Sequence, residues 1–297
     1  MRLEKKATLV STSVAALLVT IKMVVGLLSG SIAILASAID SLLDLSVSLF
    51  NYFALHNTEK NPDEKFQFGR SKIEPLAAVL EGVIISFSAL FILYEAVLKI
   101  LHPREMQYIN ESIIVMILSM VITAALVLFL NSVAKKTGNM VIRADALHYK
   151  TDLFSNAAVL TALVVIELRQ QELIDPLLGV AIAFYMLYSA FPIIKEGLLM
   201  LLDASLPPED VEKIEQVLSS ERGIADYHFL RTRESGSHIF ISVHAVFNIS
   251  VSLYEAHLVS DKLEAKLREL FEDKKVHIMI HMDPYDDSEI NDDEENW

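Results

Sequence analysis

Two segments of the chain each carry a pair of ionisable side chains four residues apart within an otherwise apolar run. The first pair is Asp40 and Asp44, and the second is His148 and Asp152. On an α-helix this spacing places both side chains on one face, one turn apart. Two such helices facing each other would offer three carboxylates and one imidazole to a single point, which suits a tetrahedral Zn²⁺ ion. The alternative is that the four residues lie near helix ends, solvated or paired. Two pairs of ligand type favour the metal site.

The elements that must position these pairs are six long apolar runs in the first two thirds of the chain. The sequence is 53% hydrophobic, and the excess is concentrated in these runs. About 20 apolar residues are enough to cross a bilayer as a helix. The runs occupy roughly residues 7–29, 32–56, 76–101, 110–134, 144–167 and 177–200. Charge inside a bilayer is costly, so the pairs in the second and fifth runs are candidates for function.

Basic residues are distributed unevenly over the segments between these runs. They gather at the amino terminus, between the second and third runs, and between the fourth and fifth, where they are Arg2, Lys5, Lys6, Lys60, Lys65, Arg70, Lys72, Lys135, Lys136 and Arg143. Because basic loops stay in the cytoplasm, this pattern predicts that both termini are cytoplasmic. The first run follows basic residues as a secretory signal would, but it is too long for one, so we expect a retained helix.

The last third of the chain has the composition of a soluble domain. Pro207 and Pro208 cannot continue a helix and mark its start. The sequence pattern predicts a helix, two strands, a helix and a strand, over residues 210–218, 229–233, 238–247, 253–271 and 276–282. The order αββαβ indicates a two-layer α+β domain. We therefore expect a six-helix transmembrane domain, a cytoplasmic domain and an acidic disordered tail, over residues 1–205, 206–285 and 286–297.

Composition limits the chemistry that the chain can perform. None of its 297 residues is cysteine, so disulfides and thiolate metal sites are excluded, and any metal must be bound by Asp, Glu and His. A net charge of -14 disfavours nucleic acid as a partner. The helical motif His-Glu-x-x-His does not occur, which argues against a membrane metalloenzyme.

The two pairs stand within a series of motifs that resembles the cation diffusion facilitator family, in particular its bacterial branch for zinc and ferrous-iron efflux. Their order and spacing extend over almost the whole chain, and the motifs are Gly30-Ser31, Asp40-x-x-x-Asp44, Phe68-Gly-Arg-Ser-Lys72, Glu74-Pro-Leu-Ala-Ala78, Arg143-Ala-Asp-Ala-Leu-His-Tyr149, Leu201-Leu-Asp203, Leu230-Arg-Thr-Arg233 and Ile280-His-Met-Asp-Pro284. The resemblance implies a multi-pass homodimer in the bacterial inner membrane that exports divalent metal ions in exchange for protons by alternating access.

The resemblance also implies which residues bind metal. The transport site would be Asp40, Asp44, His148 and Asp152, and the histidine in it is similar to the zinc branch rather than the manganese branch. The cytoplasmic domain resembles the family's metallochaperone-like, ferredoxin-like fold, whose binuclear zinc site would use His228, His244, His257, His281 and Asp283. The residues agree in part, because His281 and Asp283 share one face of an expected strand and His244 lies on its neighbour. His238 and His277 match no family ligand.

Two further features follow from the resemblance. Lys72 and Asp203 match an ion pair that joins the membrane bundle to the cytoplasmic domain. Relatives often have a third zinc site in the loop between the second and third spans, built from an aspartate and two histidines. Here the aspartate is Asp63, but the histidine positions hold Phe66 and Arg70. Phenylalanine cannot ligate and arginine repels a cation, so we expect this site to be absent.

Two acidic residues outside the quartet are also candidates. Glu81 lies within the third run, and Asp145 lies one turn before His148. Either belongs to the path of the proton or of the arriving ion, or is a structural residue satisfied by a neighbour.

The expected function is proton-coupled efflux of Zn²⁺, with Fe²⁺, Cd²⁺ and Co²⁺ left open as cargo. Zn²⁺ is then both transported and structural, no organic cofactor is expected, and the partners are protons, membrane lipid and a second copy of the chain. The alternative is a membrane-bound metal sensor that does not transport. The cytoplasmic site alone would suffice for a sensor, so the intact intramembrane quartet favours the transporter.

Overall fold

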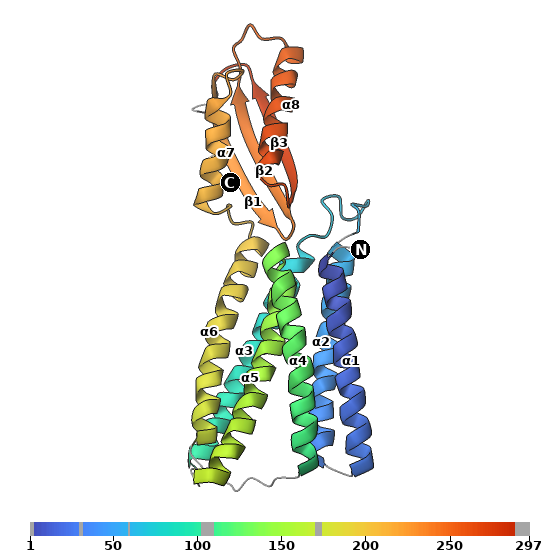
Figure 1. The fold of residues 1–297 in the computed structure, drawn as a ribbon. Helices are drawn as coiled ribbons and strands as arrows, with labels where there is room; N and C mark the ends of the chain where they lie inside the picture. The colour runs from blue at the N-terminus through green and yellow to red at the C-terminus, as the bar shows by residue number, and fades with distance from the viewer. Residues whose placement is uncertain (1–2, 30–31, 59, 102–109, 170–173, 289–297) are drawn as a thin grey trace. The chain divides into compact units, whose positions relative to one another are not determined.

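The computed structural model describes residues 3–29, 32–58, 60–101, 110–169 and 174–288 (Figure 1). The chain divides into two compact units, Met1–Leu198 and Leu199–Trp297. Each unit is described by itself below.

The first unit consists of long helices, as the apolar runs predicted. They are α1 (Leu3–Ser29), α2 (Ile32–Thr58), α3 (Ile73–Leu101), α4 (Asn110–Thr137), α5 (Met140–Arg169) and α6 (Ile174–Leu201). Among the described residues, five of these helices are long and apolar enough to cross a membrane. The exception is α5, whose first half carries Arg143, Asp145, His148, Lys150 and Asp152. The helix that holds half of the expected transport site is therefore the most polar of the six.

The local sequence determines where α5 begins. Gly138 has a φ of 64°, and its amide donates to the carbonyl of Ala134, which ends α4. The next residue, Asn139, accepts a hydrogen bond from the amide of Ile142 at 3.1 Å and so caps α5. The carboxylate of Glu74 on α3 also accepts from the amide of Met140 at 3.2 Å. These contacts place the polar half of α5 beside α3.

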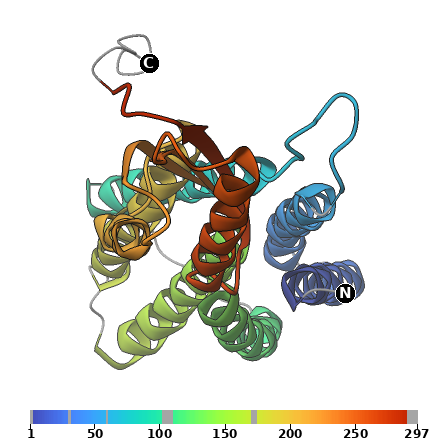
Figure 2. The same ribbon diagram turned by 90° about the horizontal axis from the view of Figure 1, so that it is seen from above.

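The helices of this unit pack around a core of small and aliphatic side chains. Viewed along the bundle in Figure 2, α1 lies beside α2 and α4 beside α5. α5 also contacts α2 and α3, so it is covered on several sides. Tyr149, Leu130, Ile142, Ala54 and Ala77 are buried in the shared core. Large apolar side chains such as Phe87 and Leu128 are exposed, as expected for side chains that face lipid.

Glycines allow α3 and α6 to approach closely. A Cβ atom at Gly82 of α3 would lie 2.7 Å from Cγ1 of Ile194, and one at Gly197 of α6 would lie 2.5 Å from Cγ2 of Val79. Small residues serve this purpose at helix contacts in membranes, where close packing and not hydrophobicity drives association.

The second unit is a three-stranded sheet with two helices. In chain order it contains α7 (Pro208–Ser220), β1 (Asp226–Ser235), β2 (His238–Val246), α8 (Leu253–Glu269) and β3 (Lys275–Asp283). This confirms the expected α+β class and the order αββαβ. The strands lie in the order β1-β2-β3, with β1 antiparallel and β3 parallel to β2. β1 begins three residues before the predicted strand because it pairs with β2 as far as Asp226 and Val246.

The two faces of the sheet have different roles. Alternate residues of β2, including Ile239, Ile241 and Val243, are buried in a core with Leu218 of α7 and Leu267 of α8. The intervening residues of β2, including His244, lie on the opposite face, because successive side chains of a strand alternate between faces. α8 begins with a capping box between Ser252 and Glu255. The sheet can therefore present polar groups on one face without weakening its core.

The contact between α3 and α6 gives a test of the fold. We expect Gly197→Val to lower the free energy of unfolding by about 1–3 kcal/mol, because the larger side chain would overlap Val79 and the backbone carbonyl of Pro75. Thermal unfolding of the purified protein in detergent measures the effect. Leu198→Phe adds bulk at the neighbouring exposed position and is the control. Equal stability of the two variants would contradict the packing.

Candidate metal sites

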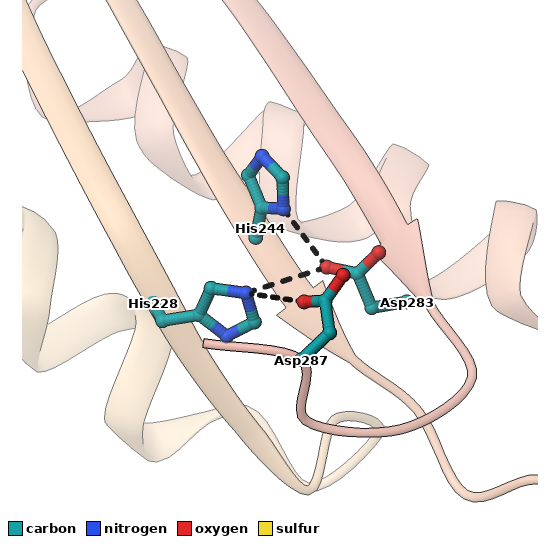
Figure 3. Close-up of side chains that lie close together, drawn as sticks. All are labelled: His228, His244, Asp283 and Asp287. Carbon is teal, nitrogen blue, oxygen red and sulfur yellow. Dashed lines mark hydrogen bonds and ion pairs between the residues drawn. The ribbon is translucent and has the colours of Figure 1, made fainter. Parts of the chain in front are cut away.

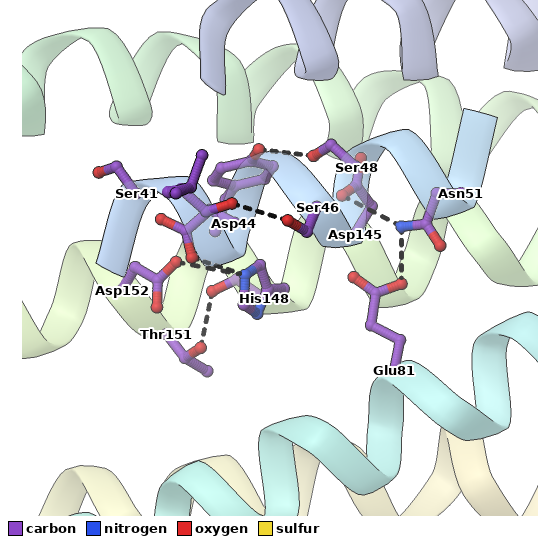
Figure 4. Close-up of polar contacts among 12 residues, drawn as sticks. Ser41, Asp44, Ser46, Ser48, Asn51, Glu81, Asp145, His148, Thr151 and Asp152 are labelled. Atoms are coloured by element: carbon purple, nitrogen blue, oxygen red, sulfur yellow. Dashed lines mark hydrogen bonds and ion pairs between the residues drawn. The ribbon is translucent and has the colours of Figure 1, made fainter. Parts of the chain in front are cut away.

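The first cluster of potential ligands lies between α2 and α5 (Figure 4). Asp44, His148 and Asp152 each offer an atom, and these atoms all lie within 4.8 Å of one another. Nε2 of His148 is 3.3 Å from Oδ1 of Asp44 and 3.7 Å from Oδ2 of Asp152. That oxygen of Asp152 is buried and has no hydrogen-bond partner among the residues that the structure describes. Two carboxylates and an imidazole at these separations fit a Zn²⁺ ion with one position left open.

Hydrogen bonds next to the cluster hold its two helices in place. The hydroxyls of Tyr149 on α5 and Ser48 on α2 are 2.7 Å apart and buried. Thr151 donates to the carbonyl of His148 at 2.7 Å. Tyr149 follows His148 directly, and Ser48 is one turn from Asp44. The bond between their hydroxyls therefore sets the distance between the two ligand-bearing turns.

The structure brings together three of the four residues expected at the transport site. Asp40 lies one turn before Asp44 on α2, where it is exposed, and it is not part of the cluster found among the described residues. Its role as a ligand stays a prediction.

Lys22 is a candidate that the sequence analysis missed. It is a buried lysine on α1, and its Nζ donates to Oγ of Ser41 at 2.7 Å and to the carbonyl of Ser37 at 3.4 Å. Its ammonium also interacts electrostatically with Asp44, Asp40 and Asp152. The sequence does contain a signal for it, because Lys22 is a single lysine within the first apolar run. A charged side chain inside a membrane is costly and therefore unusual.

Glu81 and Asp145 belong to a second buried polar group, built around Asn51. Nδ2 of Asn51 on α2 donates to Oε2 of Glu81 on α3 at 3.0 Å, and it lies 3.4 Å from Oδ1 of Asp145 on α5. All three side chains are buried. The two acidic residues were expected from sequence, but the amide that joins them was not.

The second cluster lies on the polar face of the sheet (Figure 3). His228, His244, Asp283 and Asp287 offer atoms that all lie within 4.8 Å of one another. Oδ2 of Asp283 is 2.9 Å from Nδ1 of His244 and 3.6 Å from Nε2 of His228. Oδ1 of Asp287 is 3.1 Å from the same Nε2 of His228. Two imidazoles and two carboxylates at this spacing fit a tetrahedral Zn²⁺ ion.

The strand register brings the histidines together. His228 of β1 pairs with His244 of β2, which pairs with His281 of β3, so the three form one row across the sheet. A β-bulge follows His228, and Phe229 adopts a φ of 49° there. Nδ1 of His281 is 3.4 Å from Nε2 of His244, and its Nε2 is 3.7 Å from Oδ1 of Asp283. His281 therefore borders the cluster.

The membership of this cluster differs from expectation at two residues. His257 is exposed on α8, where its Nε2 lies 3.8 Å from Oδ2 of Asp261, and it is not part of the cluster found among the described residues. Asp287 joins the cluster although we had assigned it to the acidic tail, of which 289–297 lie outside the described residues. The sequence feature that could have identified Asp287 as a candidate ligand is its position only four residues after Asp283.

In the loop between α2 and α3, Asp63 is engaged by neighbouring protein groups. Its carboxylate accepts hydrogen bonds from the amides of Phe66 and Lys65 at 2.8 and 3.0 Å and forms an ion pair with Arg70. These contacts lower the pKa of Asp63, and the hydrogen bond from the Phe66 amide has the largest effect. The guanidinium of Arg70 also lies 4.3 Å from the centre of the Phe66 ring. The absence of a metal site here stays a prediction.

Lys72 and Asp203 belong to the two different units, so their ion pair also stays a prediction. Within the second unit, Asp203 accepts a hydrogen bond from Arg233 at 2.9 Å.

Two domain families of known proteins match this chain. Residues 8–202 match the cation efflux transmembrane domain, and residues 206–285 match the cytoplasmic domain of cation efflux proteins. The cation-efflux pump FieF of Escherichia fergusonii is 35% identical over 283 residues, which cover 95% of this chain and 93% of the pump. The FieF pumps of Klebsiella pneumoniae and Escherichia coli have the same identity and coverage.

A solved structure on the mode of action of CzrB, in its Zn form, is 35% identical over 27% of this chain and 90% of that chain, with a TM-score of 0.25. The family assignment rests instead on the two domain matches and the pumps. Together they account for nearly all of the chain, and the protein is therefore a member of the cation efflux family, a multi-pass membrane transporter of divalent metal ions.

Proposed function

We propose that this transporter exports Zn²⁺ from the cytoplasm in exchange for protons. The observation that carries the proposal is the meeting of Asp44, His148 and Asp152 between two membrane helices. A non-transporting sensor has no need of ligand atoms at this depth. In this proposal Asp40 completes the site as a fourth ligand when the helices shift during transport.

The donor set supports the choice of zinc. Imidazole suits Zn²⁺, whereas a set made only of oxygen atoms favours harder ions such as Mn²⁺. Fe²⁺, Cd²⁺ and Co²⁺ accept similar ligands and are the competing cargoes.

The exchange for protons follows from the chemistry of the ligands. Metal ions bind the deprotonated forms of aspartate and histidine, so an arriving ion displaces protons and arriving protons displace the ion. An inward proton gradient would then drive the ion out, with the bundle alternating its access around a fixed site.

Polar groups on both sides of the cluster support a path across the bundle. On one side lies the buried group of Asn51, Glu81 and Asp145. On the other is a cavity of about 150 Å³, whose lining includes Lys22, Ser37, Ser119 and Asn156. The cluster occupies the point between them. The basic loops place the first side in the cytoplasm, with both termini, and α5 crosses the membrane as the sixth span in this proposal.

In the cytoplasmic unit, the proposed role of zinc is structural. His228, His244, Asp283 and Asp287, together with His281, would hold a zinc pair that stiffens the sheet. The exposed His257 would be recruited only by a change in position of α8 or by the second copy in the homodimer. In this proposal residues 1–205 form the transport domain in the bacterial inner membrane, and residues 206–285 form the cytoplasmic domain.

The first prediction concerns the membrane cluster. Asp44→Ala and Asp152→Ala should each reduce Zn²⁺ flux in proteoliposomes to the level of empty vesicles. Each substitution removes one of the three ligand residues of the cluster, and two residues are too few to hold the ion. Asp63→Ala removes an exposed carboxylate of the α2–α3 loop and should retain the wild-type rate. Unchanged flux in either cluster variant would refute the site, and a wild-type protein that binds zinc without flux would favour the sensor.

The second prediction concerns metal choice. His148→Asp keeps a ligand but makes the donor set all oxygen, so it should bring the initial flux of Mn²⁺ close to that of Zn²⁺. The measurement compares both ions in the same vesicles, with an imposed pH gradient to report coupling to protons. His238→Asp makes the same change on the sheet and is the control. A metal ranking identical to that of the wild type would show that selectivity resides elsewhere.

The third prediction concerns the sheet cluster. His244→Ala and Asp287→Asn should each lower the zinc retained by the full-length protein after dialysis, because the first removes an imidazole from the cluster and the second replaces a charged carboxylate with a neutral amide. His277→Ala should not lower the zinc content, although His277 lies on the same face of the sheet and forms a hydrogen bond with His238 at 3.0 Å. Elemental analysis of dialysed protein measures the content. Full retention in Asp287→Asn would assign that residue to the tail.

A further inference from the structure

Three oxygen atoms of the polar group around Asn51 are buried and have no hydrogen-bond partner among the described residues. They are Oδ1 of Asn51, Oε1 of Glu81 and Oδ2 of Asp145. The parent side chains are exposed by 0% for Asn51 and Asp145 and by 1% for Glu81. They come from α2, α5 and α3, and Figure 4 shows them gathered around the Asn51 amide. Buried oxygens of this kind are rare and need an explanation.

Among the described residues, no lysine or arginine forms an ion pair with Glu81 or Asp145, and the basic side chain that interacts electrostatically with both is His148 of the neighbouring cluster. The amide of Asn51 is one donor group shared between two carboxylates, and the hydroxyl of Ser11 adds another donor beside Asp145. Hydrogen bonds to neutral donors do not balance two carboxylates in a low dielectric, where an uncompensated charge is very costly. A cation is the occupant that would balance this charge, and a rotation of the Asn51 amide, whose nitrogen faces both carboxylates in this structure, would turn Oδ1 towards it.

We propose that Asn51, Glu81 and Asp145 form a second cation site, an oxygen-only station that the divalent ion occupies on its way to the Asp44–His148–Asp152 cluster. Asn51 follows Asp44 by seven residues on α2, and Asp145 precedes Asp152 by seven on α5. At 1.5 Å per residue the two sites lie about 10 Å apart along the helices. Its place on the export path rests on the proposed function, but its ability to bind a cation does not.

The chemistry of the two sites differs in a useful way. Carboxylate and amide oxygens are hard ligands that accept Mn²⁺ as well as Zn²⁺, whereas the imidazole of His148 favours Zn²⁺. The station therefore concentrates divalent ions with little discrimination, and selection takes place at the next site. With only three protein donors, the ion keeps water in its remaining positions and is released easily.

The difference in ligands makes Mn²⁺ a suitable probe. The experiment titrates the full-length protein with Mn²⁺ in the His148→Ala background, which removes the imidazole of the neighbouring site, and follows free Mn²⁺ by electron paramagnetic resonance. We expect the added substitutions Glu81→Gln and Asp145→Asn each to weaken binding by about tenfold or more, because each replaces a charged oxygen with a neutral one of the same shape. The sheet cluster is intact in every sample and contributes equally.

A substitution that is expected to strengthen binding controls for misfolding as the cause of weaker binding in the other variants. Asn51→Asp adds a third carboxylate and should tighten Mn²⁺ binding, and a damaged fold cannot produce that result. Asn57→Asp, on the same helix but with its amide bound to the carbonyl of Phe53, is the matched control and should change nothing.

The outcomes separate the two proposals. Mn²⁺ affinity that is the same in Glu81→Gln, Asp145→Asn and Asn51→Asp would overturn the station and show that the carboxylates carry protons or are structural. If the affinities follow the expected order while the wild-type protein moves no Zn²⁺ in proteoliposomes, the station stands and the proposed export fails.

Discussion

An ionised side chain is tolerated inside a membrane protein only when other polar groups or a bound ion replace the water it has lost. This constraint governs the whole transmembrane unit. α5 carries Asp145, His148 and Asp152 in its first half, and lipid cannot solvate them. The helix is therefore covered by neighbours that supply partners, including Ser48 and Asn51 from α2 and Glu81 from α3. The packing of the bundle and the position of its candidate metal ligands have one cause.

The same constraint explains why the neighbouring contacts matter. The cap at Asn139 and the bond from Met140 to Glu74 set the start of α5, and the paired hydroxyls of Ser48 and Tyr149 set its distance from α2. An interhelical hydrogen bond in a membrane contributes only about 0.6 kcal/mol on average. Here such a bond serves mainly to fix the positions of the helices, because a ligand displaced by an ångström would no longer reach a shared ion.

The sheet site is built on a different principle. A β-sheet has a fixed register, so one row of cross-strand neighbours carries His228, His244 and His281 without any long-range adjustment. The hydrophobic face of the same strands holds the register, since a slip by one residue would turn Ile239 and Ile241 to the outside and His244 into the core. The helical site depends on packing between separate helices, whereas the sheet site depends on pairing between strands.

The sequence by itself determined everything that depends on local periodicity. The apolar runs identified the long helices, alternation identified β2 and β3, and the spacing of four put His148 and Asp152 on one face of α5. Local spacing also showed that His281 and Asp283 share a face. Such features follow from the geometry of a single helix or strand and need no knowledge of neighbours.

Only the tertiary structure decided which faces meet. Asp40 and Asp44 have the same spacing as His148 and Asp152, yet in the described part of the chain Asp44 joins the cluster with α5 and Asp40 does not. His257 stays exposed, while Asp287 returns to the sheet and contacts His228. Lys22 and Asn51 come from α1 and α2, and their hydrogen-bond partners lie on other helices. The reason is that side-chain contacts between elements depend on how helices rotate and pack, which the period of a single element does not encode.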